Sequence, residues 1–139
     1  MKKLIPSRTK YKKYHKGVIY NQTYKNIEAS NFLYGCVSLK ILEGGRITSK
    51  QIEAVRSTII KKIKKIGVLK LNVFALLAIS KKPVETRMGK GKGSVDHWVF
   101  CAQPGFIFCH ISTKNTNLAY MALKIAQGKL SLKTKVIFS

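Results

Sequence analysis

A stripe of apolar residues at helical spacing constrains the fold of this chain more than any other feature. The stripe consists of Ile52, Val55, Ile59, Ile63 and Ile66, which follow one another at intervals of 3, 4, 4 and 3 residues. This spacing places all five side chains on one face of an α-helix, and such a face is normally buried against a core. The sequence therefore predicts a helix packed on other elements, with Gly67 expected to end it.

The residues before the stripe predict where this helix begins. Thr48 and Gln51 have the spacing of a capping box, in which each side chain bonds a backbone N–H of the other residue. Ile47 and Ile52 have the spacing of a hydrophobic staple around that cap. The remaining surface of the helix is basic and carries Lys50, Arg56, Lys61, Lys62, Lys64 and Lys65.

Two apolar segments flank the predicted helix. Residues 32–42 alternate, with Val37, Leu39 and Ile41 on one face, and Gly44-Gly45 end the segment. Residues 68–79 predict a second strand. Because strands stand on both sides of the helix, its isoleucine face is expected to pack onto a sheet.

Further elements after a long basic excursion complete a small domain. Residues 96–103 and 106–111 have strand character and are separated by Pro104-Gly105, which predicts a β-hairpin. Residues 115–127 predict a second helix, and residues 133–138 a final strand. One side of that helix carries Leu118, Met121, Ala122 and Ile125. The order β-α-β-loop-β-β-α-β indicates the α+β class, with two helices packed on a largely antiparallel or mixed sheet.

The charge of the chain indicates its class of partner. Lys and Arg total 27 against 5 acids, which gives a formal net charge of +22 on 139 residues. Small soluble domains usually carry a net charge of roughly 2–8. A polyanionic partner accounts for this excess, since each phosphate contact releases counterions. Because 45% of the residues are hydrophobic, the chain is expected to form one compact domain and not a disordered basic tail.

Residues 1–31 predict a basic N-terminal arm ahead of a single α+β domain at residues 32–139. The arm interleaves cations with aromatic side chains and offers no apolar face, so it is not expected to fold alone. Rings can stack on bases or sugars while ammonium groups meet phosphates, so this pattern favours RNA. The expected contacts are Arg8, Lys10, Tyr11, Lys12, Lys13, Tyr14, His15 and Lys16.

The most distinctive segment lies within a predicted loop at residues 81–96. It reads Arg87-Met88-Gly89-Lys90-Gly91-Lys92-Gly93, with no acid inside the run. Ordering glycines costs more backbone entropy than ordering any other residue, so an external partner is expected to organise the loop. A backbone without Cβ atoms can also approach RNA closely. The segment therefore predicts a loop that enters a nucleic-acid cavity.

Enzymatic and metal-binding interpretations fit poorly. The glycine-lysine run lacks the spacing of a phosphate-binding loop, and no helix is expected to follow it. Cys101, Cys109 and His110 do not form a ligand set, because strand alternation puts Cys109 and His110 on opposite faces. No catalytic residue, metal or cofactor is predicted. The three cysteines, including Cys36, are expected to be buried thiols in a reducing compartment.

No targeting or membrane segment is expected. Met1-Lys2-Lys3 is followed by polar and basic residues instead of an apolar stretch. The longest apolar run, Val73 to Ile79, is far shorter than the ~20 residues that a membrane helix needs. A membrane-active amphipathic helix at residues 49–66 and a helix-turn-helix DNA-binding module are the rival classes. The first is disfavoured by the flanking strands, and the second by the strand character after Gly67.

Several motifs resemble the L-sixteen family of large-subunit ribosomal proteins, in its bacterial and organellar branch. The arm motif runs from Pro6 to Gly17, and Gly45-Arg46-Ile47-Thr48 leads into the first helix. The loop motif runs from Lys82 to Gly93 and is followed by Trp98-Val99. Pro104-Gly105 and residues 126–134 fit the closing segment, so that the resemblance covers about the whole chain.

The resemblance implies a structural protein that binds large-subunit ribosomal RNA, present in one copy per ribosome, among neighbouring ribosomal proteins. The arm, Arg46 and Arg56 would contact ribosomal RNA. The loop from Arg87 to Gly93 would face the peptidyl transferase centre and help to position tRNA. Residues 74–80 and His110 depart from the bacterial pattern, and Lys, Ile, Asn and Tyr are frequent. A mitochondrial ribosome is therefore expected, with a plastid or a reduced-genome bacterium as the alternative.

Overall fold

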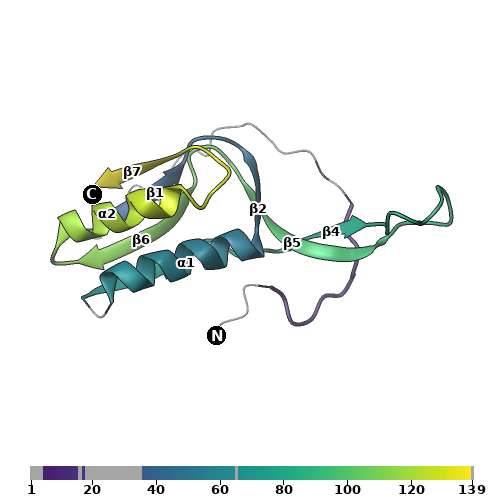
Figure 1. Ribbon diagram of the computed structural model, residues 1–139, viewed down its shortest axis with the longest axis horizontal. Helices are drawn as coiled ribbons and strands as arrows, with labels where there is room; N and C mark the ends of the chain where they lie inside the picture. The colour runs from purple at the N-terminus through teal and green to yellow at the C-terminus, as the bar shows by residue number, and fades with distance from the viewer. Residues whose placement is uncertain (1–4, 16, 18–35, 65, 139) are drawn as a thin grey trace.

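The computed structural model of the chain describes residues 5–15, 17, 36–64 and 66–138. Within these residues, seven strands and two helices form two antiparallel sheets with helices packed against them, which confirms the α+β class (Figure 1). The elements are β1 (Cys36–Ile41), β2 (Gly45–Thr48), α1 (Ser49–Ile63), β3 (Gly67–Leu71), β4 (Leu77–Lys81), β5 (Ser94–Ala102), β6 (Ile107–Thr113), α2 (Thr116–Gln127) and β7 (Thr134–Phe138).

The strands divide between a four-stranded and a three-stranded sheet. The first has the order β3-β6-β1-β7 and the second the order β2-β5-β4. Helix α2 contacts β1, β6 and β7 of the first sheet, and α1 contacts α2, β2, β3 and β5. The two helices therefore form a layer over the four-stranded sheet, and α1 reaches the three-stranded sheet as well.

Helix α1 begins as its sequence predicts. The Thr48 side chain accepts a hydrogen bond from the Gln51 backbone N–H at 3.3 Å, and the Gln51 carboxamide oxygen accepts one from the Thr48 N–H at 2.8 Å. Ile47 and Ile52 on either side of this cap are both fully buried. The capping box and the flanking apolar pair together fix the entry into the helix.

The end of α1 differs from the prediction. The helix stops at Ile63, and Lys64 closes it with a φ of 54° while its N–H bonds the Ile60 carbonyl at 2.8 Å. Ile66 lies outside the helix and is 59% exposed, so the buried stripe consists of the other four residues. The chain has to reverse here because β3 already starts at Gly67.

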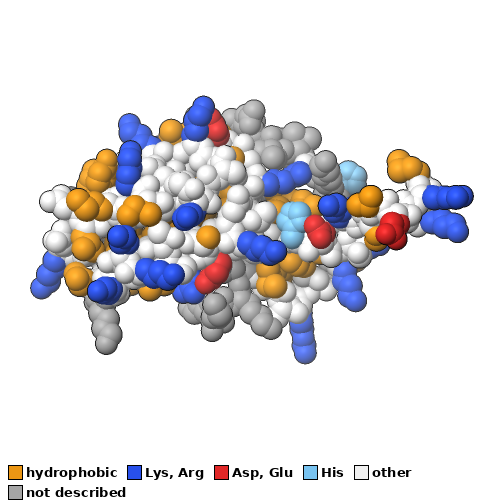
Figure 2. Space-filling model, viewed as in Figure 1, with side chains coloured by type: hydrophobic (Ala, Val, Ile, Leu, Met, Phe, Trp, Pro, Cys, Tyr) orange, Lys and Arg blue, Asp and Glu red, His pale blue; other side chains and the backbone are white. Residues whose placement is uncertain are grey.

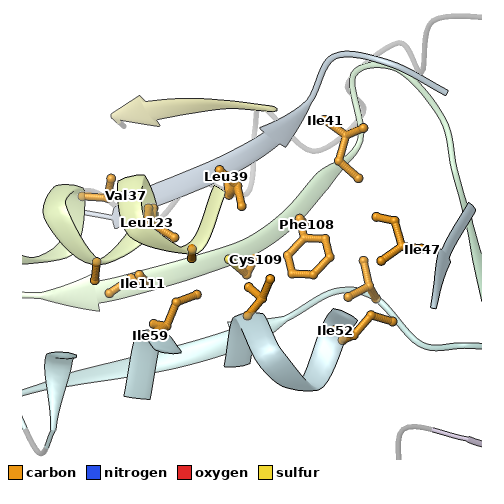
Figure 3. Close-up of a cluster of buried hydrophobic side chains, with 14 of the residues drawn as sticks. Val37, Leu39, Ile41, Ile47, Ile52, Ile59, Phe108, Cys109, Ile111 and Leu123 are labelled. Atoms are coloured by element: carbon orange, nitrogen blue, oxygen red, sulfur yellow. The ribbon is translucent and has the colours of Figure 1, made fainter. Parts of the chain in front are cut away.

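The core joins α1 to both sheets. Figure 3 shows Phe108 of β6 lying among Ile41, Ile47 and Ile52, which come from β1, β2 and α1. All four side chains are at most 2% exposed. At roughly 25 cal/mol per Å² of buried apolar surface, such a cluster supplies most of the driving force that holds the two sheets together.

Residues 68–79 form two strands instead of the single predicted one. Strand β3 ends at Leu71 and pairs with β6, whereas β4 starts at Leu77 and pairs with β5 of the other sheet. Val73 and Ala75 between them are buried in the core. The chain uses this apolar stretch to cross from one sheet to the other.

The predicted hairpin around Pro104-Gly105 is also wrong. The turn is present, but β5 and β6 belong to different sheets. The Gly105 N–H donates to the Ile41 carbonyl at 2.7 Å, and the Ile41 N–H donates to the Phe106 carbonyl at 2.8 Å. The backbone groups beside the turn therefore bond β1, and the chain changes sheets there. The short strand β2, which pairs with β5, was not predicted.

Helix α2 begins and ends close to the predicted residues but buries a different face. Asn115 caps it by accepting from the Leu118 N–H at 3.2 Å. The buried side chains are Ala119, Ala122, Leu123 and Ala126. Met121 and Ile125, which share one side of the helix with Leu118 and Ala122 in the sequence pattern, are 65% and 45% exposed. Small alanines let α2 lie close to α1 and β1, so the larger side chains point outward. The final strand, β7, is confirmed.

Candidate nucleic-acid interface

The glycine-lysine loop is the tip of a long β-hairpin. Strands β4 and β5 pair in antiparallel fashion, and residues 82–93 connect them at the far end of the molecule from helix α2 (Figure 1). Met88 is 97% exposed and Val84 is 96% exposed, so neither packs on the domain. The hairpin therefore projects the predicted tRNA-facing residues Arg87 to Gly93 into solvent.

The loop backbone is bent by three consecutive left-handed residues. Gly89, Lys90 and Gly91 have φ values of 96°, 51° and 86°. The Lys82 ammonium donates to the Gly89 carbonyl and braces the bend from the start of the loop. A Cβ added at Gly89 or Gly91 would meet nothing within 4 Å. Gly89 and Gly91 thus allow the left-handed backbone conformation, and the space around them is open.

Gly93 has a steric role within the hairpin itself. A Cβ at this residue would lie 2.5 Å from the Lys81 carbonyl oxygen and 2.9 Å from the Lys82 nitrogen. Gly93 therefore lets the two sides of the hairpin approach each other where the loop leaves the sheet. This contact lies within the chain, and the close approach of the loop to RNA stays a prediction.

The N-terminal arm lies against this loop. The Lys13 ammonium donates to the Lys92 carbonyl at 2.7 Å, and the Lys92 ammonium donates to the Tyr14 carbonyl at 2.5 Å. Lys13 of the arm thus bonds the loop, and Lys92 of the loop bonds the arm. The structure brings together two predicted RNA-binding segments that are 79 residues apart in the sequence.

The remaining described arm residues are open to solvent. Tyr11 is 72% exposed and Tyr14 is 59% exposed, and the Lys10 ammonium lies 5.6 Å from the centroid of the Tyr11 ring. The exposed residues of the predicted set also include Arg8, Lys10, Lys12, Lys13 and His15. Lys16, which completes that set, lies outside the described residues. These rings and cations are free to meet an external surface.

Arg46 and Arg56, the two predicted contacts within the domain, are differently placed. The Arg46 guanidinium on β2 donates to the Gly17 carbonyl at 3.0 Å and so holds the arm to the three-stranded sheet. Arg56 on α1 pairs with Glu53 at 2.6 Å. The hydrogen bond from Arg56 lowers the pKa of Glu53, and the same bond raises the pKa of Arg56. Arg56, which stays a predicted RNA contact, is therefore already part of an ion pair.

Acidic groups add little to this surface. Asp96 at the base of the loop lies 2.8 Å from the His97 Nδ1, and that hydrogen bond lowers the pKa of the Asp96 carboxyl. Neither Asp96 nor Glu85 forms an ion pair with Arg87 among the described residues. Figure 2 shows Lys and Arg side chains over both the domain and the loop, with few acids between them. The visible face is therefore strongly cationic.

The cysteines are only partly as expected. Cys36 and Cys109 are buried, and burial raises the pKa of the Cys109 thiol to about 12. Cys101 is exposed, because it stands on β5 opposite Arg46 at the surface of the small sheet. Among the residues that the structure describes, no three His, Cys, Asp or Glu side chains are grouped to hold a metal ion. No described helix has the length and apolar character needed to cross a membrane.

Sequence reasoning missed the contacts that join the arm to the domain. The Lys13, Lys92 and Arg46 side chains all donate to backbone carbonyls that lie far away in the sequence. Every residue has such a carbonyl, so no pattern of side chains could have revealed these partners. The Glu53–Arg56 pair, in contrast, had a readable signal in its i,i+3 spacing on a helix.

Comparison with known proteins identifies the family of this chain. Residues 6–137 match the family model described as Ribosomal protein L16p/L10e. The chain is 44% identical over 135 residues to "Large ribosomal subunit protein uL16c" of Euglena longa, and the match covers 97% of this chain and 98% of that protein. The chain therefore belongs to the L16p/L10e family of ribosomal proteins and is a structural constituent of the large ribosomal subunit.

Proposed function

We propose that this protein binds large-subunit ribosomal RNA through its arm and its glycine-lysine loop, and that the loop helps to position tRNA. The observation that carries the proposal is the crossed pair of hydrogen bonds between Lys13, Lys92 and Tyr14. These bonds join the arm and the loop into one cationic surface. RNA can then contact both segments at once instead of ordering each of them separately.

The chemistry of this surface suits phosphates and stacked bases. Arg8, Lys10 and Lys12 are exposed cations beside the exposed ring of Tyr11. Contacts of cations with phosphates fix the position of a protein without reading the base sequence. An RNA-binding structural protein needs this kind of contact, and the net charge of +22 supplies a strong sequence-independent attraction.

The loop is suited to positioning and not to proton transfer. Arg87 offers a planar fork for bidentate phosphate contact, and Lys90 adds a mobile positive charge. Arginine stays protonated, and a lysine beside phosphates does so as well. The loop would therefore hold tRNA near the reaction centre while the ribosomal RNA performs the chemistry.

Ribosomes that carry Arg87→Ala and Lys90→Ala test the role of the loop. Lys92 is left intact because it also holds the arm. Loss of charge-assisted bonds is expected to slow tRNA accommodation roughly tenfold, with an unchanged rate of peptide transfer to puromycin. Lys114→Ala with Lys129→Ala, at exposed positions just before and just after α2, is the matched control. If the loop variant accommodates tRNA at the normal rate, the loop does not position tRNA and only joins RNA segments.

We further propose that the protein works in a plastid ribosome. The relative from Euglena longa carries the name of a chloroplast form, which fits the plastid alternative and gives no support to a mitochondrial ribosome. Mass spectrometry of salt-washed large subunits from isolated plastids should detect the chain. Recovery from mitochondrial large subunits alone would contradict this placement.

A further inference from the structure

An apolar pocket lies where the arm crosses the three-stranded sheet. It has a volume of about 380 Å³ and is lined by Tyr14, Gly17, Phe74, Leu76, Leu77, Val99, Phe100 and Cys101. Its walls come from the arm, from the segment that joins the two sheets, and from strands β4 and β5. The segment at residues 74–80, which departs from the bacterial pattern, thus contributes one side of the pocket.

The sheet supplies a largely apolar floor. Leu77 stands opposite Val99 in the β4–β5 pair, and Arg46 stands opposite Cys101 in the β2–β5 pair. Val99 and Cys101 are two residues apart on β5, so all four side chains lie on the same face of the sheet. Val99 is 2% exposed, whereas Cys101 is open to solvent. The floor is therefore closed at Val99 and accessible at Cys101.

Two cations fix the wall that the arm provides. The Lys92 ammonium binds the Tyr14 carbonyl at 2.5 Å, and the Arg46 guanidinium binds the Gly17 carbonyl at 3.0 Å. Both residues of the arm that line the pocket are thus bonded to the domain. A pocket whose walls are already held loses less entropy when it is filled.

We propose that an unpaired nucleobase of the large-subunit RNA occupies this pocket. The inference rests on the proposed RNA-binding function and assigns it a specific site. A base fits because the lining is apolar and Tyr14 offers an exposed ring for stacking. The phosphates of the same nucleotide would meet the cationic arm, including Lys12 and Lys13, so the charge around the pocket favours RNA over an apolar protein segment.

Arg46 provides a second argument for a polar aromatic ligand. Its Nε is buried and has no hydrogen-bond partner among the described residues. An unpaired buried donor is costly, and an acceptor on a bound nucleotide would satisfy it. Bases carry such acceptors at the ring edge, whereas an aliphatic side chain does not.

Chemical probing of unpaired bases in salt-washed large subunits tests the proposal. Leu76→Asp places a charge in the pocket at a position that is 68% exposed, so the fold should tolerate it. One unpaired base that is protected in the parent subunits should become roughly tenfold more reactive at its Watson–Crick edge. Tyr14→Phe, which keeps the ring, should retain the protection, as should Leu42→Asp at an exposed position elsewhere.

The Cys101 thiol gives an independent measurement. In intact subunits its alkylation by N-ethylmaleimide should be at least roughly tenfold slower than in the free protein, because a stacked base covers it. Alkylation at the rate of the free protein would overturn the proposal, since the pocket would be empty. Slow alkylation without a base that responds to Leu76→Asp would also overturn it, and would assign the pocket to a protein neighbour.

The nucleobase site and the proposed RNA-binding function give different results when they fail. If the Leu76→Asp protein is present in the large subunits but no base changes reactivity, the nucleobase site is wrong and RNA binding by the arm and loop still stands. If the parent protein is itself absent from salt-washed subunits, the proposed function fails. Sedimentation of each variant before probing separates these results.

Discussion

Lys13 and Lys92 join the arm and the loop, because each ammonium donates a hydrogen bond to a backbone carbonyl of the other segment. Lys13 donates to the Lys92 carbonyl at 2.7 Å, and Lys92 donates to the Tyr14 carbonyl at 2.5 Å. Two like charges are neighbours here because each ammonium faces carbonyl dipoles instead of the other ammonium. The arm, which has no apolar face of its own, gains a fixed position from these bonds and from Arg46.

Removal of the Lys92 ammonium should free the arm. Lys92→Met is expected to accelerate chymotryptic cleavage after Tyr11 and Tyr14 in the free protein by up to roughly tenfold, since an exposed hydrogen bond contributes about 0.5–1.5 kcal/mol. Lys90→Met changes the same loop without touching a bond to the arm in the described part of the chain. Equal cleavage rates in the two variants would show that Lys92 does not hold the arm.

Loss of the Thr48 cap should destabilise the domain. Thr48→Ala removes the acceptor for the Gln51 N–H and is expected to lower the free energy of unfolding by about 1 kcal/mol, measured in urea. Thr58→Ala is the control, because Thr58 bonds the Ala54 carbonyl on the exposed side of α1 and alanine is the better helix former. A cap variant as stable as the control variant would contradict the role of Thr48.

Local signals explain what the sequence could predict. The capping box at Thr48 and Gln51 depends on residues within one helical turn, so its position could be read directly. The apolar stripe on α1 is equally local. These features, together with the order of the predicted helices and strands, were enough for the α+β class.

Long-range pairing explains what the sequence could not predict. Nothing in residues 68–79 indicates that β3 and β4 choose different partner strands, because both are apolar and the break between them is buried. The Pro104-Gly105 turn is real, but whether a turn closes a hairpin depends on β1, which bonds its backbone. On α2, the buried face consists mainly of alanines because α1 packs close to it. The sequence of α2 alone does not show how close α1 lies.

The candidate interface could also be predicted only in part from the sequence. The basic arm and loop stood out by composition, and most of their described residues are exposed to solvent. Their mutual contact, and the pocket between Tyr14 and the small sheet, depend on backbone carbonyls and on the course of residues 72–76. Such features arise only when the chain is folded.

Gly93 should be the least replaceable glycine of the loop for the stability of the hairpin. Gly93→Ala would push a methyl group to 2.5 Å from the Lys81 carbonyl oxygen, so the ends of β4 and β5 have to separate. Backbone hydrogen exchange at residues 79–81 and 94–96 is expected to become roughly tenfold faster, which corresponds to about 1–2 kcal/mol of local stability. Gly17→Ala, where a Cβ meets nothing within 4 Å, is the control. Unchanged exchange in Gly93→Ala would contradict the steric argument.

The three thiols should differ in reactivity. In the native free protein at pH 8, a thiol reagent should modify Cys101 at once, while Cys36 and Cys109 react only on unfolding. Burial raises the pKa of the Cys109 thiol from 9.0 to about 12. The contribution of the protonated thiol to the free energy of unfolding is therefore complete below pH 9 and declines as the pH rises toward 12. Cys101→Ser should abolish the fast phase. A fast phase that survives in this variant would mean that a second thiol is accessible.

The salt dependence of binding to large-subunit RNA tests the central claim most directly. Replacing Arg8, Lys10 and Lys12 by alanine should reduce the slope of log K against log salt concentration by about 2–3, because each lost phosphate contact removes roughly 0.7–0.9. Replacing Lys114, Lys124 and Lys129 at the α2 end removes the same charge and should change the slope by less than about 1. If both triple variants give the same slope, the arm has no special role and the cationic surface acts only through net charge.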